Sequence, residues 1–292
     1  MKIETKNLSK NFGDKKALNH INLTIEPNKI IGLLGRNGAG KTTLLQLLAG
    51  HFKPSEGEIL INGENPFNRS HVLEKVCLIS EANNFKRKLK IREILKMISR
   101  FYPNWSQPTA ERLLKIFNLA PSLNAKGLSK GMESALSIII GLSSRTDITI
   151  FDEPYIGMDA YARYRFYAIL LEEYEAYPRT IIISTHLIDE VSNLFEDVVL
   201  MHDGSILLHE SAEEMKNKSL QISGSLEKVT AFSEGKNVIY TTQIMGQKTV
   251  FIYGEKAIEE QQAKAMGLSV ERCSIQELMV HLTNSQEEGL YV

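Results

Sequence analysis

The first 65 residues carry short runs of apolar positions separated by turn residues. Residues 21–25 place an apolar side chain at every second position, which is typical of a strand with one buried face. Residues 30–34 are apolar throughout, as in a strand covered on both faces. Residues 59–61 predict a third strand, and Asn62-Gly63 directly after it is a hairpin signal.

From about residue 91 to residue 118 the apolar positions follow helical spacing, and Pro103 and Pro108 are expected to break this region into two segments. The remaining pattern alternates helices with apolar strands. Its predicted members are a strand at 76–80, a helix at 136–142, a strand at 148–151, a helix at 161–174 and a strand at 180–184. Such alternation predicts an α/β fold with a mainly parallel core sheet.

The composition changes after Gly204. A small hairpin is expected around Met245-Gly246, between strands at 238–242 and 249–253, and two helices are expected after it, at about 257–266 and 275–282. We therefore predict two parts. The first is a main domain of residues 1–210, which includes a helical subdomain at about 85–145, and the second is a small α+β appendage of residues 211–292.

The charges of the 292 residues nearly cancel, since 34 Lys and Arg face 35 Asp and Glu, for a net charge of −1. This balance argues against a polybasic nucleic-acid binder and against an acidic disordered chain. Cys77 and Cys273 lie far apart and form no CxxC pair, so neither a disulfide framework nor a zinc ribbon is expected.

The apolar runs also bear on membranes. Glu4 interrupts the apolar start that a secretion signal requires. Apolar runs such as residues 138–140 and 181–183 fall far short of the roughly 18 residues that span a bilayer. We expect no transmembrane segment in this chain.

A glycine-rich stretch follows the apolar strand at 30–34. Its residues match the phosphate-loop pattern G-x-x-x-x-G-K-S/T and run into an apolar helix. The glycines allow successive N–H groups to point at phosphate, and the helix start adds its positive dipole end. Lys41 is expected to bridge the β- and γ-phosphates, and the Thr42 hydroxyl to ligate Mg²⁺. The predicted nucleotide-binding set is Gly35, Arg36, Asn37, Gly38, Ala39, Gly40, Lys41, Thr42 and Thr43.

Polar residues end two further apolar strands. Asp152 lies where a parallel strand would reach the sheet edge of the phosphate loop, and can hold Mg²⁺ through its water shell. Glu153 projects differently and can orient the attacking water as a general base. An ordinary acidic turn would give the same pair, but the phosphate loop upstream favours the catalytic interpretation. His186 follows the strand at 180–184, at the edge where ligands collect in such sheets.

Residues 128–132, Leu-Ser-Lys-Gly-Met, precede the buried helix and the acidic strand. In this order and spacing they resemble the LSGGQ signature of the ATP-binding subunits of ABC transporters. The resemblance covers about residues 1–210. It implies a P-loop NTPase of the ABC ATPase type, with an N-terminal antiparallel β subdomain and an α-helical subdomain, that hydrolyses ATP with Mg²⁺. The length and the segment at 101–105 also resemble the Ytr-type transporter ATPases of Gram-positive bacteria.

The resemblance implies roles for further residues. Phe12 matches the aromatic residue that stacks on adenine. Asp159 lies in the D-loop, which crosses between subunits. Ser129 and Gly131 belong to the signature that closes over ATP bound to a second subunit.

The same match gives Asp152 and Glu153 the positions of the Mg²⁺ ligand and the catalytic base, and gives His186 that of the switch histidine on the γ-phosphate. The implied partners are a second ATP-binding subunit, in a homo- or heterodimer, and a separate membrane permease. The implied location is peripheral, at the cytoplasmic face of the cell membrane. No nucleic-acid partner is expected.

Three positions depart from the family pattern. Glu81 stands where the Q-loop usually has Gln; a carboxylate can still ligate Mg²⁺ but cannot donate a hydrogen bond when ionised. Lys130 replaces the first Gly of the signature and Met132 its final Gln. These changes lead to the hypothesis of a heterodimer with unequal sites.

Several interpretations stay open. The basic stretch at 85–92 is either a solvated helix start or a surface that faces the permease. A hydrolysis-impaired regulatory subunit of a heterodimeric complex would also explain the three departures. A soluble ABC ATPase acting on ribosomes or DNA is disfavoured, because the chain has one phosphate loop, no long coiled-coil insertion and almost no net charge.

Overall fold

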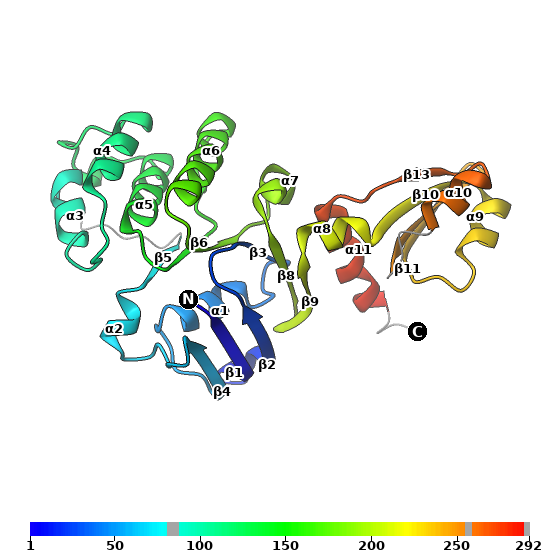
Figure 1. Cartoon of the computed structure of the whole chain (residues 1–292), viewed down its shortest axis with the longest axis horizontal. Coiled ribbons are helices and arrows are strands. Elements are labelled where there is room, and N and C mark those ends of the chain that lie inside the picture. The colour runs from blue at the N-terminus through cyan, green and yellow to red at the C-terminus, as the bar shows by residue number, and fades with distance from the viewer. Residues whose placement is uncertain (81–87, 255–258, 289–292) are drawn as a thin grey trace. The chain divides into compact units, whose positions relative to one another are not determined.

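The computed structural model describes residues 1–80, 88–254 and 259–288 of the chain (Figure 1). The chain divides into two compact units, Met1–His209 and Glu210–Val292. Within the described residues, no helix is long and apolar enough to cross a bilayer.

A six-stranded sheet forms the centre of the first unit. Its strands lie in the order β5-β6-β7-β3-β8-β9, and neighbours from β5 to β8 are parallel. The three central strands β6, β7 and β3 are buried along their whole length, which explains their largely apolar sequences, and the pairing confirms the mainly parallel sheet. The strands are β3 (Ile30–Leu34), β5 (Val76–Ser80), β6 (Ile148–Asp152), β7 (Thr180–Ser184), β8 (Asp197–His202) and β9 (Ser205–Ser211).

A second, antiparallel sheet has the order β2-β1-β4, with β1 (Ile3–Phe12), β2 (Lys15–Ile25) and β4 (Glu56–Ile61). It shares one apolar core with the parallel sheet and with α1 (Lys41–Leu48). The hairpin predicted after β4 was wrong. Asn62 and Gly63 do form a tight turn with positive φ, but β4 pairs with β1, and the next element is the short helix α2 (Ser70–Leu73).

Three helices group together beside the parallel sheet, as Figure 1 shows: α3 (Ile91–Ile98), α4 (Gln107–Ile116) and α5 (Lys130–Ser144). The predicted division into two helical segments is confirmed, with Pro103 between α3 and α4, but Pro108 lies inside α4 rather than between the two helices. It is the second residue of α4, one position after Gln107, and the helix is capped by Ser106, whose hydroxyl accepts a hydrogen bond from Thr109 N. A proline is tolerated there because the first turn leaves its N–H groups without helical partners anyway.

The chain between β6 and β8 adds α6 (Ala160–Ala176), which ends before β7, and α7 (Ile188–Val191), which follows it. Two short 3₁₀ helices, Ala125–Gly127 and Ser192–Leu194, complete the unit.

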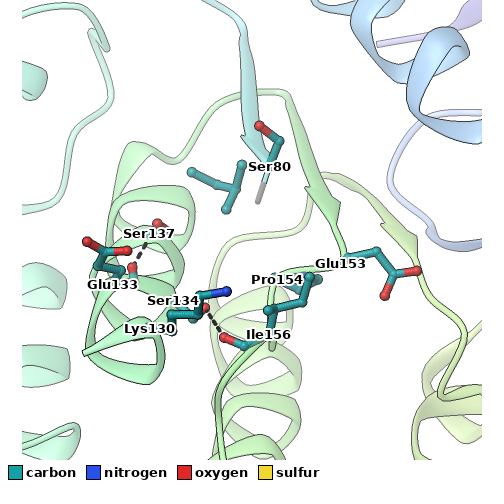
Figure 2. A pocket seen from close by; sticks show the side chains of 9 residues that line it. Ser80, Lys130, Glu133, Ser134, Ser137, Glu153, Pro154 and Ile156 are labelled. Atoms are coloured by element: carbon teal, nitrogen blue, oxygen red, sulfur yellow. Dashed lines mark hydrogen bonds between the residues drawn. The ribbon is translucent and has the colours of Figure 1, made fainter. Parts of the chain in front are cut away.

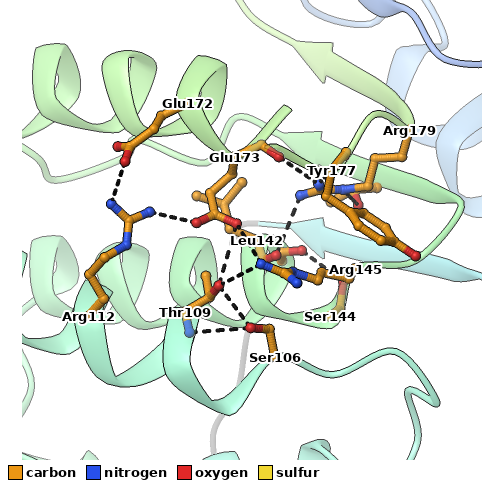
Figure 3. A network of polar contacts seen from close by, with 12 residues as sticks. Ser106, Thr109, Arg112, Leu142, Ser144, Arg145, Glu172, Glu173, Tyr177 and Arg179 are labelled. Carbon is orange, nitrogen blue, oxygen red and sulfur yellow. Dashed lines mark hydrogen bonds and ion pairs between the residues drawn. The ribbon is translucent and has the colours of Figure 1, made fainter. Parts of the chain in front are cut away.

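A buried acid joins the helical group to α6 (Figure 3). The carboxylate of Glu173 on α6 is about 5% exposed, and its Oε1 lies 2.5 Å from Arg112 Nη2 on α4. Its Oε2 lies 3.7 Å from Arg145 Nη2, after α5, and accepts from Thr109 at 3.5 Å. Arg112 also pairs with the neighbouring Glu172, which is largely exposed. Glu173 therefore links α6 both to α4 and to the residue that follows α5.

Glu173→Ala is expected to lower the free energy of unfolding by about 2–3 kcal/mol, because it leaves two guanidinium groups without their buried acceptor. Glu172→Ala is the matched control on the same helix and against the same Arg112. It is expected to cost less than about 1 kcal/mol because its ion pair is exposed. Urea unfolding followed by the fluorescence of Trp105, the single tryptophan, measures both. Equal losses for the two variants would contradict the buried role of Glu173.

The second unit is built around a four-stranded antiparallel sheet with the order β11-β12-β10-β13. Its chain order is β-α-β-β-α-β, and its apolar core lies between the sheet and two helices, α9 and α10. The hairpin predicted around Met245-Gly246 is confirmed. The elements are α8 (Ala212–Asn217), β10 (Ser219–Ser225), α9 (Leu226–Ser233), β11 (Val238–Ile244), β12 (Gln247–Tyr253), α10 (Glu259–Ala265), β13 (Ser269–Glu271) and α11 (Ile275–Glu288).

Candidate nucleotide-binding site

The glycine-rich loop connects β3 to α1 in a conformation that requires glycine. Gly38 and Gly40 have φ of +88° and +101°. A Cβ on Gly40 would lie 2.7 Å from the carbonyl oxygen of Ala17, so this position lacks the space for a side chain as well. No side chain among the described residues caps the start of α1. Its first N–H groups are therefore available to a ligand, which is the usual basis of phosphate binding at a helix start.

Lys41, the first residue of α1, turns its ammonium back onto the loop. Its Nζ donates to the carbonyl oxygens of Gly35 and Arg36 at 2.6 and 3.1 Å. Burial lowers the pKa of Lys41, while the nearby carboxylates of Glu153 and Asp152 act in the opposite direction. The buried ammonium is a charged donor at the phosphate loop, and charged donors form the stronger hydrogen bonds to phosphate oxygens.

A cavity of about 290 Å³ lies over the loop. The side chain of Phe12 at its rim is exposed and meets Phe52 edge to face, with ring centroids 5.4 Å apart. Of the predicted residues, those lining the cavity are Phe12, Asn37, Gly38, Gly40, Lys41, Thr42, Thr43, Asp152 and Glu153. Lys15, Ala17 and Ser184 also line it, and the sequence pattern had not singled them out. Gly35, Arg36 and Ala39 belong to the loop but are not among the lining residues.

The acid at the end of β6 has an unused oxygen. Asp152 is buried, it pairs in register with Ser184 of β7, and both residues line the cavity. Asp152 Oδ1 and Ser184 Oγ are buried without a hydrogen-bond partner among the described residues. An unpaired buried carboxylate oxygen calls for a cation or ordered water.

The donor set fits Mg²⁺ completed by phosphate and water. Among the described residues, no group of three His, Cys, Asp or Glu side chains could hold a metal ion by itself. Mg²⁺ in phosphate sites is usually bound by one or two protein oxygens, with water and phosphate oxygens filling the rest of its shell. Asp152 and the hydroxyl of Thr42, in the same cavity, supply such oxygens.

Glu153 follows β6 in the left-handed region, with φ of +51°, and its N–H donates to Ser184 O at 3.1 Å. Both Asp152 and Glu153 line the phosphate-loop cavity. Glu153 Oε2 lies 2.6 Å from His186 Nδ1, which comes after β7. The parallel pairing of β6 with β7 thus brings together two residues 33 positions apart in the sequence.

Sequence analysis did not single out Tyr155, which is 3% exposed and lies beneath this pair. Its hydroxyl donates to Glu153 Oε2, lies 2.6 Å from Thr185 Oγ1 and accepts from His186 N at 3.1 Å. Burial, together with the bond to Glu153, raises the pKa of Tyr155. The only feature of the sequence that could have pointed to Tyr155 is its position, two residues after Glu153.

The signature residues lie at the start of α5. Ser129 is the N-cap, and its side chain accepts from Met132 N at 3.2 Å. Gly131 packs so closely on the D-loop that an added Cβ would lie 2.5 Å from Gly157 O. Asp159 caps α6 by accepting from Ala162 N at 2.8 Å. Ser129, Gly131 and Asp159 are not among the residues lining the cavity of this chain's phosphate loop.

A second cavity, of about 160 Å³, separates the start of α5 from the turn after β6 (Figure 2). Lys130 and Ser134 of α5 lie on one side of it, and Pro154 and Ile156 on the other. Ser134 Oγ donates to Ile156 O at 2.6 Å and links the two sides.

Glu81 lies outside the described residues, as does the part of the basic stretch from residue 85 to residue 87. Within the rest of that stretch, α3 begins at Ile91, with Lys90 as its N-cap.

The chain was compared with known families and structures. The model of the family described as ABC transporter matches residues 18–156. The chain is 31% identical to the bacitracin transport ATP-binding protein BcrA of Bacillus licheniformis over 221 residues, which are 74% of this chain and 72% of BcrA. It is 27% identical to the ABC transporter ATP-binding protein YtrB of Bacillus subtilis over 220 residues, 75% of each chain.

Solved structures agree on the fold. An ATP-binding subunit of an ABC transporter matches 74% of this chain and 92% of its own, with a TM-score of 0.67 and 25% identity. A dimeric post-hydrolysis state of the ATP-binding cassette MJ0796 with ADP and Pi matches 72% of this chain and 98% of its own, with a TM-score of 0.64 and 22% identity. The predicted fold class is confirmed. With its phosphate loop, acid pair and signature helix on this fold, the chain belongs to the ABC transporter ATP-binding proteins and is an ABC ATPase.

Proposed function

We propose that this chain binds and hydrolyses MgATP as the motor subunit of a transporter whose permease is a separate membrane protein. The observation that carries the proposal is the set of groups around one cavity. Lys41, the unpaired oxygen of Asp152 and the Glu153–His186 pair come from three neighbouring parallel strands and their loops. Their charges and orphaned groups suit a triphosphate, a cation and an activated water.

ATP binding is the first step. The N–H groups of the loop and of the start of α1 bind the phosphates, and Lys41 exchanges the carbonyl oxygens of Gly35 and Arg36 for phosphate oxygens. The exposed ring of Phe12 at the rim offers a stacking surface to the base.

Hydrolysis requires charge neutralisation and an oriented water. The Thr42 hydroxyl and Asp152 would hold Mg²⁺, which when bound offsets the charge that develops on the phosphate oxygens. Glu153 accepts the proton of the water that attacks the γ-phosphate. His186 holds Glu153 through Nδ1, and its largely exposed ring lies within reach of a γ-phosphate contact.

The site is completed by a second ATP-binding subunit. Ser129, Gly131 and Asp159 form no part of this chain's own cavity, so their proposed action is on nucleotide bound to the partner subunit. A dimer that closes on ATP and reopens after hydrolysis supplies the mechanical step. Lys130 and Met132 in the signature support a heterodimer with unequal sites.

We further place the chain at the cytoplasmic face of the cell membrane, as a peripheral subunit held by its permease. The similarity to BcrA, a bacitracin transport ATP-binding protein, and to YtrB, an ABC transporter ATP-binding protein, supports this assignment. The two-unit organisation, with an ATPase domain of residues 1–210 and an accessory domain of residues 211–292, belongs to the same proposal.

The test combines binding, turnover and partner capture. Purified chain is titrated with ATP in the presence of Mg²⁺, phosphate release is measured, and the tagged chain is recovered from detergent-solubilised membranes of its source cells. We expect saturable ATP binding, Mg²⁺-dependent phosphate release and co-purification of a polytopic membrane protein. Binding without turnover, even in the complex with its permease, would favour the hydrolysis-impaired regulatory subunit. Failure to bind ATP would overturn the proposal.

The contact between the signature helix and the D-loop gives a prediction of its own. Gly131→Ala is expected to lower ATP turnover about 10-fold, because the new Cβ must displace the D-loop carbonyl of Gly157 by a fraction of an ångström. Gly127→Ala is the matched control four residues upstream, where an added Cβ meets nothing within 4 Å, and should keep wild-type turnover. Steady-state phosphate release measures both, and equal activities would show that this contact does not matter for turnover.

A further inference from the structure

The hydroxyl of Tyr155 lies at the centre of the contacts that hold Glu153. It touches four groups of the site: the Glu153 carboxylate, the Thr185 hydroxyl, the backbone N–H of His186 and, at 3.5 Å, Nδ1 of the same histidine. The rings of Tyr155 and His186 also meet edge to face, with centroids 5.7 Å apart. These partners come from the turn after β6 and the segment after β7, the two places that carry the proposed base and the switch histidine.

The donors and acceptors of this cluster have one consistent assignment. The Tyr155 proton goes to the carboxylate of Glu153, which can only accept when ionised. The oxygen of Tyr155 then accepts from His186 N, so the remaining contact must be a donation from Thr185 Oγ1. Thr185 Oγ1 in turn accepts from the N–H of Leu187 at 2.9 Å. A directed chain of hydrogen bonds therefore ends on Oε2 of Glu153, and each member strengthens the next.

Resting on the proposed role of Glu153, we propose that Tyr155 is a positioning residue of the hydrolysis site, whose hydroxyl anchors Oε2 of Glu153 and ties it to the segment that carries His186. With Oε2 bound to Tyr155 and His186, Glu153 Oε1 is the oxygen left to take the proton of the attacking water. Tyr155 is not among the residues that line the phosphate-loop cavity, and in this proposal it acts only through the carboxylate.

The ring of Tyr155 is buried and contributes packing, whereas its hydroxyl contributes the hydrogen bond to Glu153. A phenylalanine would keep the buried ring and its packing while removing the donor to Glu153 and the acceptor of two buried groups. The effect should therefore fall on the catalytic step rather than on ATP binding, because the lining of the phosphate-loop cavity does not include Tyr155.

The chain offers a matched control for this change. Tyr167 on α6 is also buried, at 6% exposure, and its hydroxyl has no hydrogen-bond partner among the described residues. Both Tyr155→Phe and Tyr167→Phe remove a buried hydroxyl oxygen. Only Tyr155→Phe also removes a hydrogen bond to Glu153.

The experiment measures kcat and KM for ATP, together with amide hydrogen exchange of the full chain, for wild type and both variants. Tyr155→Phe is expected to lower kcat about 10-fold with KM unchanged. It should also speed exchange of the His186 amide, which loses its acceptor. Tyr167→Phe should match wild type in both readouts.

The outcomes separate this inference from the proposed function. An unchanged kcat for Tyr155→Phe in a chain whose wild type hydrolyses ATP would overturn the positioning role and leave the ATPase assignment intact. Unchanged exchange at His186 would overturn it without reference to activity. A rise in KM equal to the fall in kcat/KM would also count against it, because the hydroxyl would then act on ATP binding. Loss of turnover in the wild type itself would instead overturn the proposed function.

Discussion

Glu153→Gln is expected to lower ATP turnover by about 10² to 10⁴-fold while ATP binding stays near the wild-type level. The amide keeps the size of the side chain but cannot accept the proton of the attacking water. Glu153 lines the cavity without contacting the ammonium of Lys41, so the phosphate contacts should survive the change. Phosphate release together with equilibrium binding of ATP measures the two effects separately.

The matched control for this variant is Glu56→Gln, which alters an exposed carboxylate on β4 and should leave turnover unchanged. An active Glu153→Gln variant would remove Glu153 from the mechanism, and with it the role inferred for Tyr155. Loss of binding and turnover together would indicate that Glu153 holds the site in shape.

Lys41→Ala should weaken ATP binding on the order of 100-fold, because a charge-assisted contact to the phosphates is lost. The ammonium now donates to two loop carbonyls, so the variant also removes the group that holds the loop before ATP arrives. Turnover at saturating ATP should fall as well, since the same cation stabilises charge on the transferred phosphoryl group.

The exposed Lys16 on β2 provides the control, and Lys16→Ala is expected to bind ATP as wild type does. Titration calorimetry of both variants gives the comparison. Equal affinities would contradict the proposed role of the phosphate loop, whatever the activity of the chain.

Local rules account for much of what the sequence alone predicted. The strands β3 and β7 were predicted with their correct bounds, since a short, largely apolar stretch between turn residues has few other solutions. The phosphate loop and the Asp152-Glu153 pair were predicted because each is a contiguous motif whose residues are adjacent in the sequence. Among the strands that were missed, β1 has a weak pattern. In β1, shifts of register around Asn7, which has positive φ, interrupt the alternation of apolar and polar positions.

The turn at Asn62-Gly63 shows the limit of such rules. Its residues adopt the predicted positive φ, yet whether a turn becomes a hairpin depends on which strand is free to pair. Here β4 pairs with β1, more than 45 residues earlier in the chain. Pairing between distant strands depends on shared burial, which no local pattern records.

The sequence by itself determined the family, the phosphate loop and the candidate acid, base and switch residues, because each motif is a short run whose spacing is imposed by backbone chemistry. Only the tertiary structure decided how these residues meet. Parallel pairing of β6 with β7 places Glu153 2.6 Å from His186 and puts the hydroxyl of Tyr155 between them. The same packing left Asp152 Oδ1 buried and without a hydrogen-bond partner in the part of the chain that the structure describes. Contacts of this kind depend on side chains from separate strands sharing one sheet edge, and spacing along a single chain cannot specify which of them touch.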